Sequence, residues 1–159
     1  MREISAGIII YRKTKEGPKF LLLYHGGRYW AFPKGKIETL PKDGRDGKEE
    51  SAKETSFRAA LRETAEETGL RPSDLKLKSR FKTYEKYTFF REKQRIFKTV
   101  IFYLAETRQR QIKISEEHEG FGWFRYEDGK RLLTIHKEPV ALLEKAYNFI
   151  SWSPRKRSV

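Results

Sequence analysis

Cysteine is absent from the 159 residues of the chain, and long apolar runs are absent as well. Without cysteine no disulfide can form, which excludes a disulfide-stabilised scaffold and favours a cytoplasmic protein. A helix that spans a bilayer needs about 18 or more apolar residues in succession, so we expect no membrane span and no membrane partner. Residues 1–10 have the composition of a strand and lack the cleavage pattern of a signal peptide.

Positive charge is in excess among the residues that are present. Lysine and arginine number 35 against 22 acidic residues, which gives a formal net charge of +13 at pH 7. This excess favours polyanionic partners, namely nucleotides, polyphosphates or RNA, although a generally basic proteome gives the same value. Hydrophobic residues make up 37% of the chain, enough for one core. We predict one domain over residues 1–152, followed by a basic tail at residues 153–159.

Residues 56–69 predict a helix with an acidic face. Alanine is frequent in this segment, and Gly69 stands where a glycine commonly ends the last turn. Glu63, Glu66 and Glu67 have the spacing that places side chains on one side of a helix. Magnesium is usually held by one or two carboxylates together with substrate phosphates, so this face is a candidate magnesium site. A solvated acidic face would give the same pattern.

The residues before this helix help to decide between the two interpretations. Residues 30–38, WAFPKGKIE, form an aromatic, proline-containing segment in which a glycine lies between two lysines. Together with the helix, this segment resembles the signature of the Nudix hydrolase family. The matching residues are Gly35, Glu54, Arg62, Glu63, Glu66, Glu67, Gly69 and Leu70. The chain departs from that signature at Thr64, where a bulky aliphatic residue is usual, and at residues 39–53, which we interpret as an insertion.

Within this family, the chain is most similar to the asymmetric diadenosine tetraphosphate hydrolases of the animal and prokaryotic type. The residues that carry this similarity are Ala6 to Ile10, Phe20 to Leu23, Trp30, Pro33 to Gly35, Phe81, Lys82, Tyr87, Lys98 to Val100, Leu104, Ala105, Glu117, His118 and Trp123. The resemblance implies a single-domain α/β (α+β) fold, an α/β/α sandwich around a mixed sheet. It also implies hydrolysis of a dinucleoside polyphosphate by attack of water on phosphorus, with diadenosine tetraphosphate giving ATP and AMP.

The resemblance also implies which residues hold the metal. Mg²⁺ or Mn²⁺, as more than one ion, is expected as the cofactor. The implied catalytic residues are Glu66, Glu67, Glu63, Arg62 and Glu117, and the implied metal ligands are Gly35, Glu63, Glu66, Glu67 and Glu117. Arg62 would fix the rotamer of a helix carboxylate, and Glu54 would do similar work near the ions. Glu117 is equally consistent with an exposed loop glutamate, and His118 with a structural histidine.

Candidate substrate contacts lie on both sides of the acidic helix in the sequence. They are Lys34, Lys36 and Lys98 for phosphates, and Tyr87 and Phe121, which match aromatic positions of relatives, for adenine. Lys98 lies in an otherwise apolar strand, which is unusual unless its end reaches a cleft. Stacking on an aromatic ring contributes about 1–3 kcal/mol per base. Core packing is the alternative for both aromatic residues.

Apolar runs and turn residues predict most of the remaining strands. Two strands are expected at residues 5–12 and 20–24, joined by a loop at residues 13–19. Both are apolar throughout, so we expect them in the centre of the sheet with both faces covered. Residues 75–87 and 94–106 are expected to form two long strands of an antiparallel hairpin.

Three further segments complete the prediction. Residues 120–126 are aromatic and predict a strand, and Pro139 is placed to begin a closing amphipathic helix. Residues 39–53 are polar and predict a surface loop, which serves either as a substrate lid or as a tolerated insertion. The later part of this loop, residues 48–53, can extend the acidic helix backward.

Two other function classes stay open. The WAFPKGK segment also resembles the mRNA-decapping Nudix enzymes, so removal of pyrophosphate or a cap from RNA 5′ ends is an alternative reaction. A non-catalytic nucleotide-binding module is the third hypothesis. Such a module would be expected to have lost a metal carboxylate, whereas Glu63, Glu66 and Glu67 are all present. The sequence gives no indication of the oligomeric state.

Overall fold

The computed structural model describes residues 1–37, 39–40, 52–134 and 137–151. In chain order its elements are β1 (Arg2–Thr14), β2 (Gly17–Tyr24), β3 (Trp30–Ala31), β4 (Lys34–Lys36), β5 (Thr39–Leu40), β6 (Ala52–Lys53), α1 (Ser56–Thr68), the 3-10 helix η1 (Pro72–Asp74), β7 (Lys76–Leu77), β8 (Thr83–Arg91), β9 (Gln94–Glu106), β10 (Gly120–Arg125), α2 (Tyr126–Leu133) and α3 (Lys137–Ser151). None of the described helices is both long enough and apolar enough to cross a membrane.

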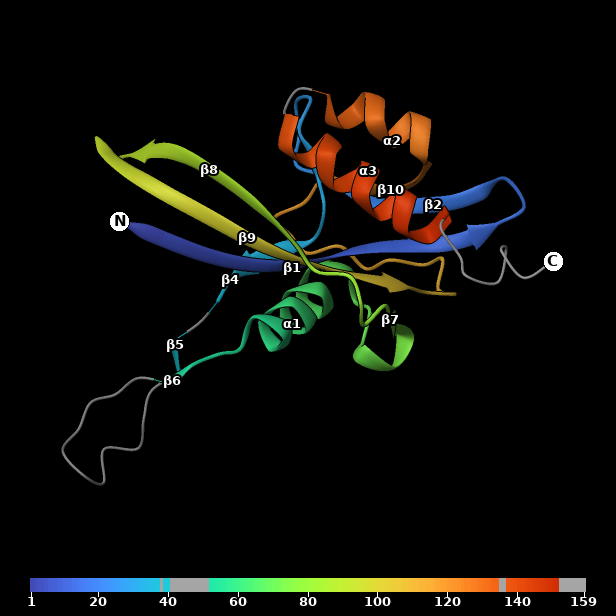
Figure 1. Cartoon of the computed structure of the whole chain (residues 1–159), viewed down its shortest axis with the longest axis horizontal. Coiled ribbons are helices and arrows are strands. Elements are labelled where there is room, and N and C mark those ends of the chain that lie inside the picture. Colours follow the sequence, from blue (N-terminus) through green and yellow to red (C-terminus); the bar gives the residue numbers. More distant parts are fainter. Residues whose placement is uncertain (38, 41–51, 135–136, 152–159) are drawn as a thin grey trace.

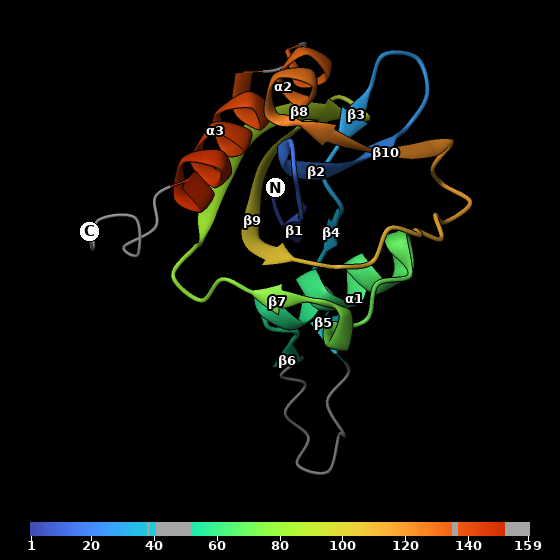
Figure 2. The same cartoon turned by 90° about the vertical axis from the view of Figure 1, so that its right-hand side faces the viewer.

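One mixed sheet forms the middle layer of the molecule. Within the described residues it has eight strands, with a main path of β10-β2-β1-β9-β7; β3 adds to β2, β4 to β1 and β8 to β9. β1 and β9 run parallel, and β1 pairs antiparallel with β2 and β4. Helix α1 covers one face, while α2 and α3 cover the other, as Figures 1 and 2 show. The predicted α/β/α sandwich around a mixed sheet is therefore confirmed.

Strands β1 and β2 lie in the centre of this sheet, as predicted. Residues 8–10, all isoleucine, have no exposed surface, because alternate side chains meet a covering layer on each face. The predicted loop at residues 13–19 is wrong, since β1 continues to Thr14, which pairs with Gly17 at the start of β2. Only a tight turn is left between the strands. Gly17 has a φ of 101°, a conformation that residues with a side chain rarely adopt.

Helix α1 begins and ends close to its predicted boundaries. The hydroxyl of Thr55 accepts a hydrogen bond of 3.2 Å from the backbone N–H of Arg58 and caps the first turn. Gly69 ends the helix in the left-handed region, at φ 76°. Ala59 and Ala60 are fully buried and belong to the core cluster on this side of β1. Their small side chains allow the helix to pack closely on the sheet.

The inserted segment differs in part from its prediction. Strands β5 and β6 pair antiparallel in a small sheet of their own. The first two and the last two residues of the insertion therefore pair with each other. The predicted backward extension of α1 is wrong for residues 52–53, because these residues pair as a strand and Thr55 caps the helix after them. Residues 41–51, and with them most of the predicted loop, lie outside the described part of the chain, as does the tail at residues 153–159.

Helices α2 and α3 cover the face opposite α1. Leu142, Leu143 and Ala146 of α3 pack in one core cluster with Phe102 of β9. Gly129 of α2 faces the same cluster, since a Cβ at this position would lie in ordinary contact, at 3.4 Å, with a methyl group of Leu143.

The boundaries of these C-terminal elements differ from the prediction. Strand β10 ends at Arg125, and Tyr126 begins α2, a helix that was not predicted because the aromatic run before it continues through its first residue. Gly129 in the middle of α2 also weakens the helical signal. The closing helix is present, but it begins at Lys137, so Pro139 lies in its first turn rather than at its first position.

The predicted hairpin is present and projects from the body of the molecule. Strands β8 and β9 pair antiparallel along the whole of β8. A turn in which the N–H of Phe81 donates to the carbonyl of Lys78 at 3.0 Å separates β8 from the short β7, so the predicted first strand is divided. Figure 1 shows β8, the paired part of β9 and the start of β1 extending beyond the helices. We call β8, residues 94–101 and residues 2–5 the wing.

Candidate active site

Arg62 of α1 is the centre of an ionic cluster that includes the predicted carboxylates. Its Nε and Nη2 donate hydrogen bonds of 2.9 and 3.0 Å to the two carboxylate oxygens of Glu54. Its Nη1 donates to Glu63 at 2.8 Å and to Glu66 at 3.3 Å. The bond with Glu54 is the main reason that the pKa of Arg62 is raised above its ordinary value. One guanidinium therefore binds three carboxylates: it orients two on the helix, as expected for Arg62, while Glu54 holds the guanidinium itself.

Strand β4 brings the backbone to these carboxylates. Gly35 pairs with Ala6 of β1, and a Cβ built on this glycine would lie 1.9 Å from Cδ of Glu63. Only glycine leaves room for the carboxylate at this position. The backbone N–H of the neighbouring Lys34 donates a hydrogen bond of 3.1 Å to Oε2 of Glu67. The predicted proximity of Gly35 to the acidic face of α1 is thus present in the fold.

Glu67 is the most deeply placed of the three helix carboxylates. The exposed fractions of the side chains are 12% for Glu67, 15% for Glu63 and 57% for Glu66. Burial raises the pKa of Glu67 to about 8; the hydrogen bond from Lys34 opposes this shift, and the negative charges of Glu63 and Glu117 add to it. A nearby cation would favour the ionised form again, so this position suits a metal ion.

A buried histidine lies beside Glu67. Nε2 of His118 is 3.9 Å from Oε1 of Glu67, and Nδ1 shares a hydrogen bond of 2.9 Å with the hydroxyl of Ser115. The ring meets that of His25 edge-on at 4.4 Å, and burial lowers the pKa of both histidines. Nε2 of His118 is buried and has no hydrogen-bond partner among the described residues. Such unpaired buried polar atoms are uncommon in proteins, which distinguishes this ring from a structural histidine with both nitrogens satisfied.

The donor chemistry of this cluster fits a hard divalent cation. Carboxylate and carbonyl oxygens are the ligands that Mg²⁺ and Mn²⁺ prefer, and both occur at the contact of α1 with Gly35. Within the described residues, however, no three acidic or histidine side chains already converge as a metal-ligand group. The guanidinium of Arg62 lies between Glu63 and Glu66 instead. Glu117 is exposed on the loop before β10, close enough for its charge to affect Glu67.

A cleft lies next to this cluster, on the side of the sheet where α3 packs. Its volume is about 350 Å³, and it is lined by Tyr29, Trp30, Ala31, Phe32, Lys34, Glu85, Tyr87, Thr88, Phe89, Phe102, Glu138 and Pro139. Nζ of Lys34 lies 5.4 Å from the centre of the Tyr87 ring. Because the backbone N–H of the same lysine binds Glu67, Lys34 connects the cleft to the carboxylate cluster. We call this pocket the aromatic cleft.

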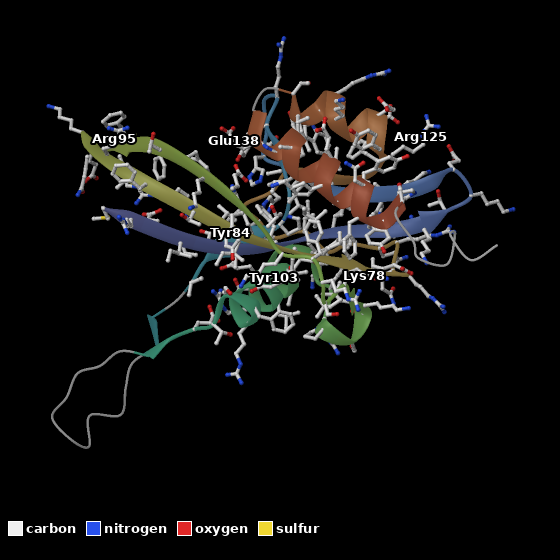
Figure 3. The ribbon with its side chains drawn as sticks, in the orientation of Figure 1. Lys78, Tyr84, Arg95, Tyr103, Arg125 and Glu138 are labelled. Atoms are coloured by element: carbon white, nitrogen blue, oxygen red, sulfur yellow. The ribbon has the colours of Figure 1, made fainter. Side chains whose placement is uncertain are left out.

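Several residues of the aromatic cleft were not predicted as site residues. Tyr29 and Trp30 follow the turn at Gly26. Two aromatic residues directly after a turn were the only sequence feature that could have indicated their place in the cleft. Glu85 is buried in β8, and only the alternation of that strand places it beside Tyr87 on one face. Glu138 arrives from α3, far along the chain, and Figure 3 shows it at the start of that helix. No sequence signal indicated it.

The structure does not bring Phe121 to Tyr87 as a second stacking ring. Phe121 is 39% exposed and pairs with Leu23, and its neighbour Trp123 belongs to the cluster on the α1 side of the sheet. Tyr87 packs against the cluster on the opposite side. A sheet therefore separates the two rings, because alternate residues of a strand point to opposite faces. Trp30, rather than Phe121, accompanies Tyr87 in the aromatic cleft.

The other two candidate phosphate ligands, Lys36 and Lys98, converge on one carboxylate in the wing. Glu3 of β1 lies 3.1 Å from Lys36 Nζ and 3.4 Å from Lys98 Nζ. It also forms an ion pair of 2.5 Å with Arg91, a cation that was not predicted to belong to the site. Three cations around one carboxylate leave an excess of positive charge next to the aromatic cleft. The side chain of Lys98 is only 10% exposed, and burial lowers its pKa.

Comparisons with known proteins agree with this architecture. The family model described as the NUDIX domain matches residues 1–144. The chain is 31% identical over 160 residues to the asymmetrical bis(5′-nucleosyl)-tetraphosphatase of Mus musculus, which covers 94% of this chain and 97% of that protein. The crystal structure of a C. elegans Ap4A hydrolase binary complex has a TM-score of 0.72 and 26% identity, and covers 94% of this chain and 98% of that one.

A more distant structure agrees in fold alone. The NUDIX domain of Shewanella oneidensis NrtR, complexed with ADP ribose, has a TM-score of 0.66 at 15% identity and covers 94% of this chain and 89% of that one. Nudix enzymes generally use divalent metal ions and act on nucleotide polyphosphates, and the carboxylate-rich α1 beside Gly35 suits both. The family match covers most of the chain, so the protein belongs to the Nudix hydrolase family and is a pyrophosphohydrolase.

Proposed function

We propose that the enzyme hydrolyses dinucleoside polyphosphates, with diadenosine tetraphosphate as the preferred substrate and ATP and AMP as products. The observation that carries the proposal is the position of Lys34, whose side chain lines the aromatic cleft while its backbone N–H binds Glu67. A base held in the cleft would have its phosphates directed at the carboxylate cluster. The similarity to asymmetrical bis(5′-nucleosyl)-tetraphosphatases over nearly the whole chain supports the same substrate class.

Adenine would bind in the aromatic cleft. Tyr87 and Trp30 offer ring faces there, and stacking on such faces contributes about 1–3 kcal/mol per base. The exocyclic amine of adenine is a hydrogen-bond donor, and the carboxylates of Glu85 and Glu138 lie in the same lining to accept from it. The phosphates would then pass Lys34 and approach the cluster around Glu3, where Lys36 and Lys98 add positive charge.

Hydrolysis would take place at the contact of α1 with Gly35. Divalent cations held by Glu63, Glu66, Glu67 and the Gly35 carbonyl would neutralise phosphate oxygens and lower the pKa of a bound water. The chain itself keeps the ligands in place, since Arg62 orients Glu63 and Glu66 and the N–H of Lys34 fixes Glu67.

The proton balance of the reaction assigns a role to a further carboxylate. The water oxygen forms a new bond to phosphorus, the bridging P–O bond breaks, and the water proton passes to a base. Glu117 is exposed and close enough to Glu67 for its charge to act there, so we assign it as this base. His118 keeps its neighbourhood ordered through Ser115.

Product analysis tests the proposal. The purified enzyme is incubated with diadenosine tetraphosphate, 5′-triphosphate RNA, NADH or 8-oxo-dGTP, each with Mg²⁺, with Mn²⁺ and with a chelator. We expect ATP and AMP in equal amounts from the first substrate, one ¹⁸O from labelled water in one of the two products, and no reaction with the chelator. Production of two ADP molecules, or faster release of pyrophosphate from the RNA, would contradict the proposed substrate.

A further inference from the structure

One side of the wing carries exposed aromatic rings and takes no part in the aromatic cleft. Tyr103 of β9 belongs to the cluster on the α1 side of the sheet, whereas Phe102 belongs to the cluster on the α3 side. By alternation along β9, Phe97 faces the α1 side, and the pairing of Tyr84 with Ile101 places Tyr84 there too. We call Arg2, Tyr84, Lys86, Phe90, Arg95 and Phe97 the open face. The open face stops at helix α1, where the ring centre of Phe57 lies 5.4 Å from the ring centre of Tyr103.

The rings of the open face are solvent-exposed to an unusual degree. Phe90 is 73% exposed, Tyr84 51% and Phe97 47%. Several large exposed rings gathered on one side of the wing are more than the scattered single apolar residues of an ordinary surface. Cations already lie over two of these rings, since Cζ of Arg95 is 5.2 Å from the centre of the Phe97 ring and Nζ of Lys82 is 6.0 Å from that of Tyr84. Figure 3 shows Tyr84 on the strands above α1 and Arg95 near the tip of the hairpin.

The charge of the open face has one sign. Arg2, Lys86 and Arg95 point to this side of the wing strands, while the acidic residues of these strands, Glu3 and Glu85, lie on the opposite side with Lys98 and Tyr87. Two copies of the chain packed through this face would place like charges together, which opposes self-association. A polyanion would find complementary charge.

We propose that the open face binds single-stranded RNA. Its bases would stack on Tyr84, Phe97 and Phe90, and its phosphates would lie near Lys86 and Arg95. Aromatic rings exposed on a sheet and separated by cations form the kind of platform on which unpaired bases stack. Tyr84 and Phe97 are about 14 Å apart along the strands, given four residues of register at about 3.4 Å each, so they hold separate bases.

A preference for RNA over DNA is expected from a threonine next to one of the rings. Thr88 borders the aromatic cleft, but its pairing with Phe97 places its side chain on the same side of the sheet as that ring, where the exposed hydroxyl can bind a ribose 2′-hydroxyl. A lipid surface would favour a continuous apolar patch, whereas here a cation or threonine separates successive rings. The open face is on the opposite side of the sheet from the aromatic cleft, so RNA bound there would leave hydrolysis of a small substrate unaffected.

Fluorescence anisotropy with a labelled oligouridylate that carries a 5′-hydroxyl tests this site independently of the proposed function, because such an RNA has no phosphoanhydride to cleave. We expect the double variant Tyr84→Ala/Phe97→Ala to weaken binding by at least about tenfold. The matched variant Tyr84→Phe/Phe97→Tyr keeps both ring faces and should bind as the parent does. Both variants should hydrolyse the nucleotide substrate at the parent rate.

A salt series tests whether the cations of the open face neutralise phosphates of the RNA. The variant Lys86→Gln/Arg95→Gln should lower the slope of log affinity against log salt by about 1.4, at about 0.7 for each phosphate that is no longer neutralised. The control Lys15→Gln/Arg131→Gln removes two exposed cations elsewhere and should leave the slope unchanged. Equal weakening by the control pair, tighter binding of the same sequence as DNA, or binding to anionic vesicles in place of RNA would each overturn the proposal. So would a parent protein that does not bind at about 50 mM salt.

Discussion

The two faces of the wing use the same strands for different surfaces. Toward α3, Glu85, Tyr87 and Lys98 are buried or partly buried, and acidic and basic groups are paired with one another. Toward α1, Tyr84, Lys86 and Phe97 are exposed, and cations lie next to rings without an acidic partner in these strands. Strand alternation separates the two sets by the thickness of one sheet. A single hairpin can therefore line an enclosed site for a small molecule on one face and offer an open surface for a polymer on the other.

Glu67→Gln should have the largest effect, and only on the cleft side. Loss of the buried carboxylate that we propose as a metal ligand is expected to lower kcat by about 10³-fold, within the range seen when a positioned charge-stabilising group is removed. Steady-state hydrolysis of diadenosine tetraphosphate measures the effect, and circular dichroism checks that the fold is intact. RNA binding by the open face should be unchanged. A variant as active as the parent would remove α1 from the catalytic assignment.

Gly35→Ala should come next. Its Cβ would lie 1.9 Å from Cδ of Glu63, far closer than two non-bonded carbon atoms can approach, so the carboxylate has to move. Displacement of a catalytic group by about 1 Å can reduce turnover by about 10²-fold. We expect a large fall in kcat and only a small change in melting temperature. Gly27→Ala, with nothing near its Cβ but a φ of 61°, is the control for a purely conformational cost. Full activity of Gly35→Ala would mean that Glu63 is free to act from another position.

Tyr87→Ala compares the two faces of one strand directly. Loss of the cleft ring should raise KM for diadenosine tetraphosphate about tenfold with little change in kcat, and should leave KM for inorganic polyphosphate unchanged. Tyr84→Ala removes a ring from the same strand on the other face and should leave both constants unaltered. Identical changes in the two variants would show that the faces are not independent.

Glu3 provides the smallest expected effect, a dependence of stability on pH. The hydrogen bond from Arg91, then that from Lys36 and the charge of Lys98, hold the pKa of Glu3 at about 2 against the opposing effect of burial. This folded pKa lies below the ordinary value of 4.5, so the contribution of Glu3 to stability is complete above about pH 4.5 and is lost as the pH falls toward 2.

The expected result is a melting temperature that falls more steeply with acid in the parent than in Glu3→Gln, between about pH 5 and about pH 2.5. Thermal unfolding followed by circular dichroism across this interval measures the difference. Arg91→Gln should also make the melting temperature depend less on pH, though by a smaller amount, because it removes the main cause of the lowered pKa of Glu3. Parallel curves for the parent and Glu3→Gln would show that the ion cluster of the wing does not contribute to stability.

The helix and its neighbours were predictable because their signals are local. Gly69 and the spacing of Glu63, Glu66 and Glu67 depend on contacts within a few residues, and α1 ends where expected. The cap at Thr55 was not predicted, because the sequence also allowed the helix to extend backward through residues 48–53. The ion pair of Arg62 with Glu54 also spans a short distance in the chain. The tight turn after Thr14 was missed, because pairing across a hairpin decides how far a strand extends and local composition does not.

The aromatic cleft was predictable only in part. Lys34 and Tyr87 were identified as candidates. Phe121 was expected to stack on adenine as well, but its side chain lies on the opposite face of the sheet from Tyr87, because alternate residues of β10 point to opposite faces. Glu138 enters from a helix whose packing on β8 no periodicity reveals. The convergence of Lys36, Arg91 and Lys98 on Glu3 likewise requires the parallel pairing of β1 with β9, two segments far apart in the chain.

The sequence by itself determined the acidic helix, the central strands and the family, since apolar runs and a spaced motif are properties of neighbouring residues, and the layers followed from the resemblance to that family. Only the tertiary structure decided which rings share a cleft, which lysines share a carboxylate and which aromatic residues stay exposed on the wing. The physical reason is that each of these depends on which face of a strand meets another element, and this is set by register and packing between distant segments.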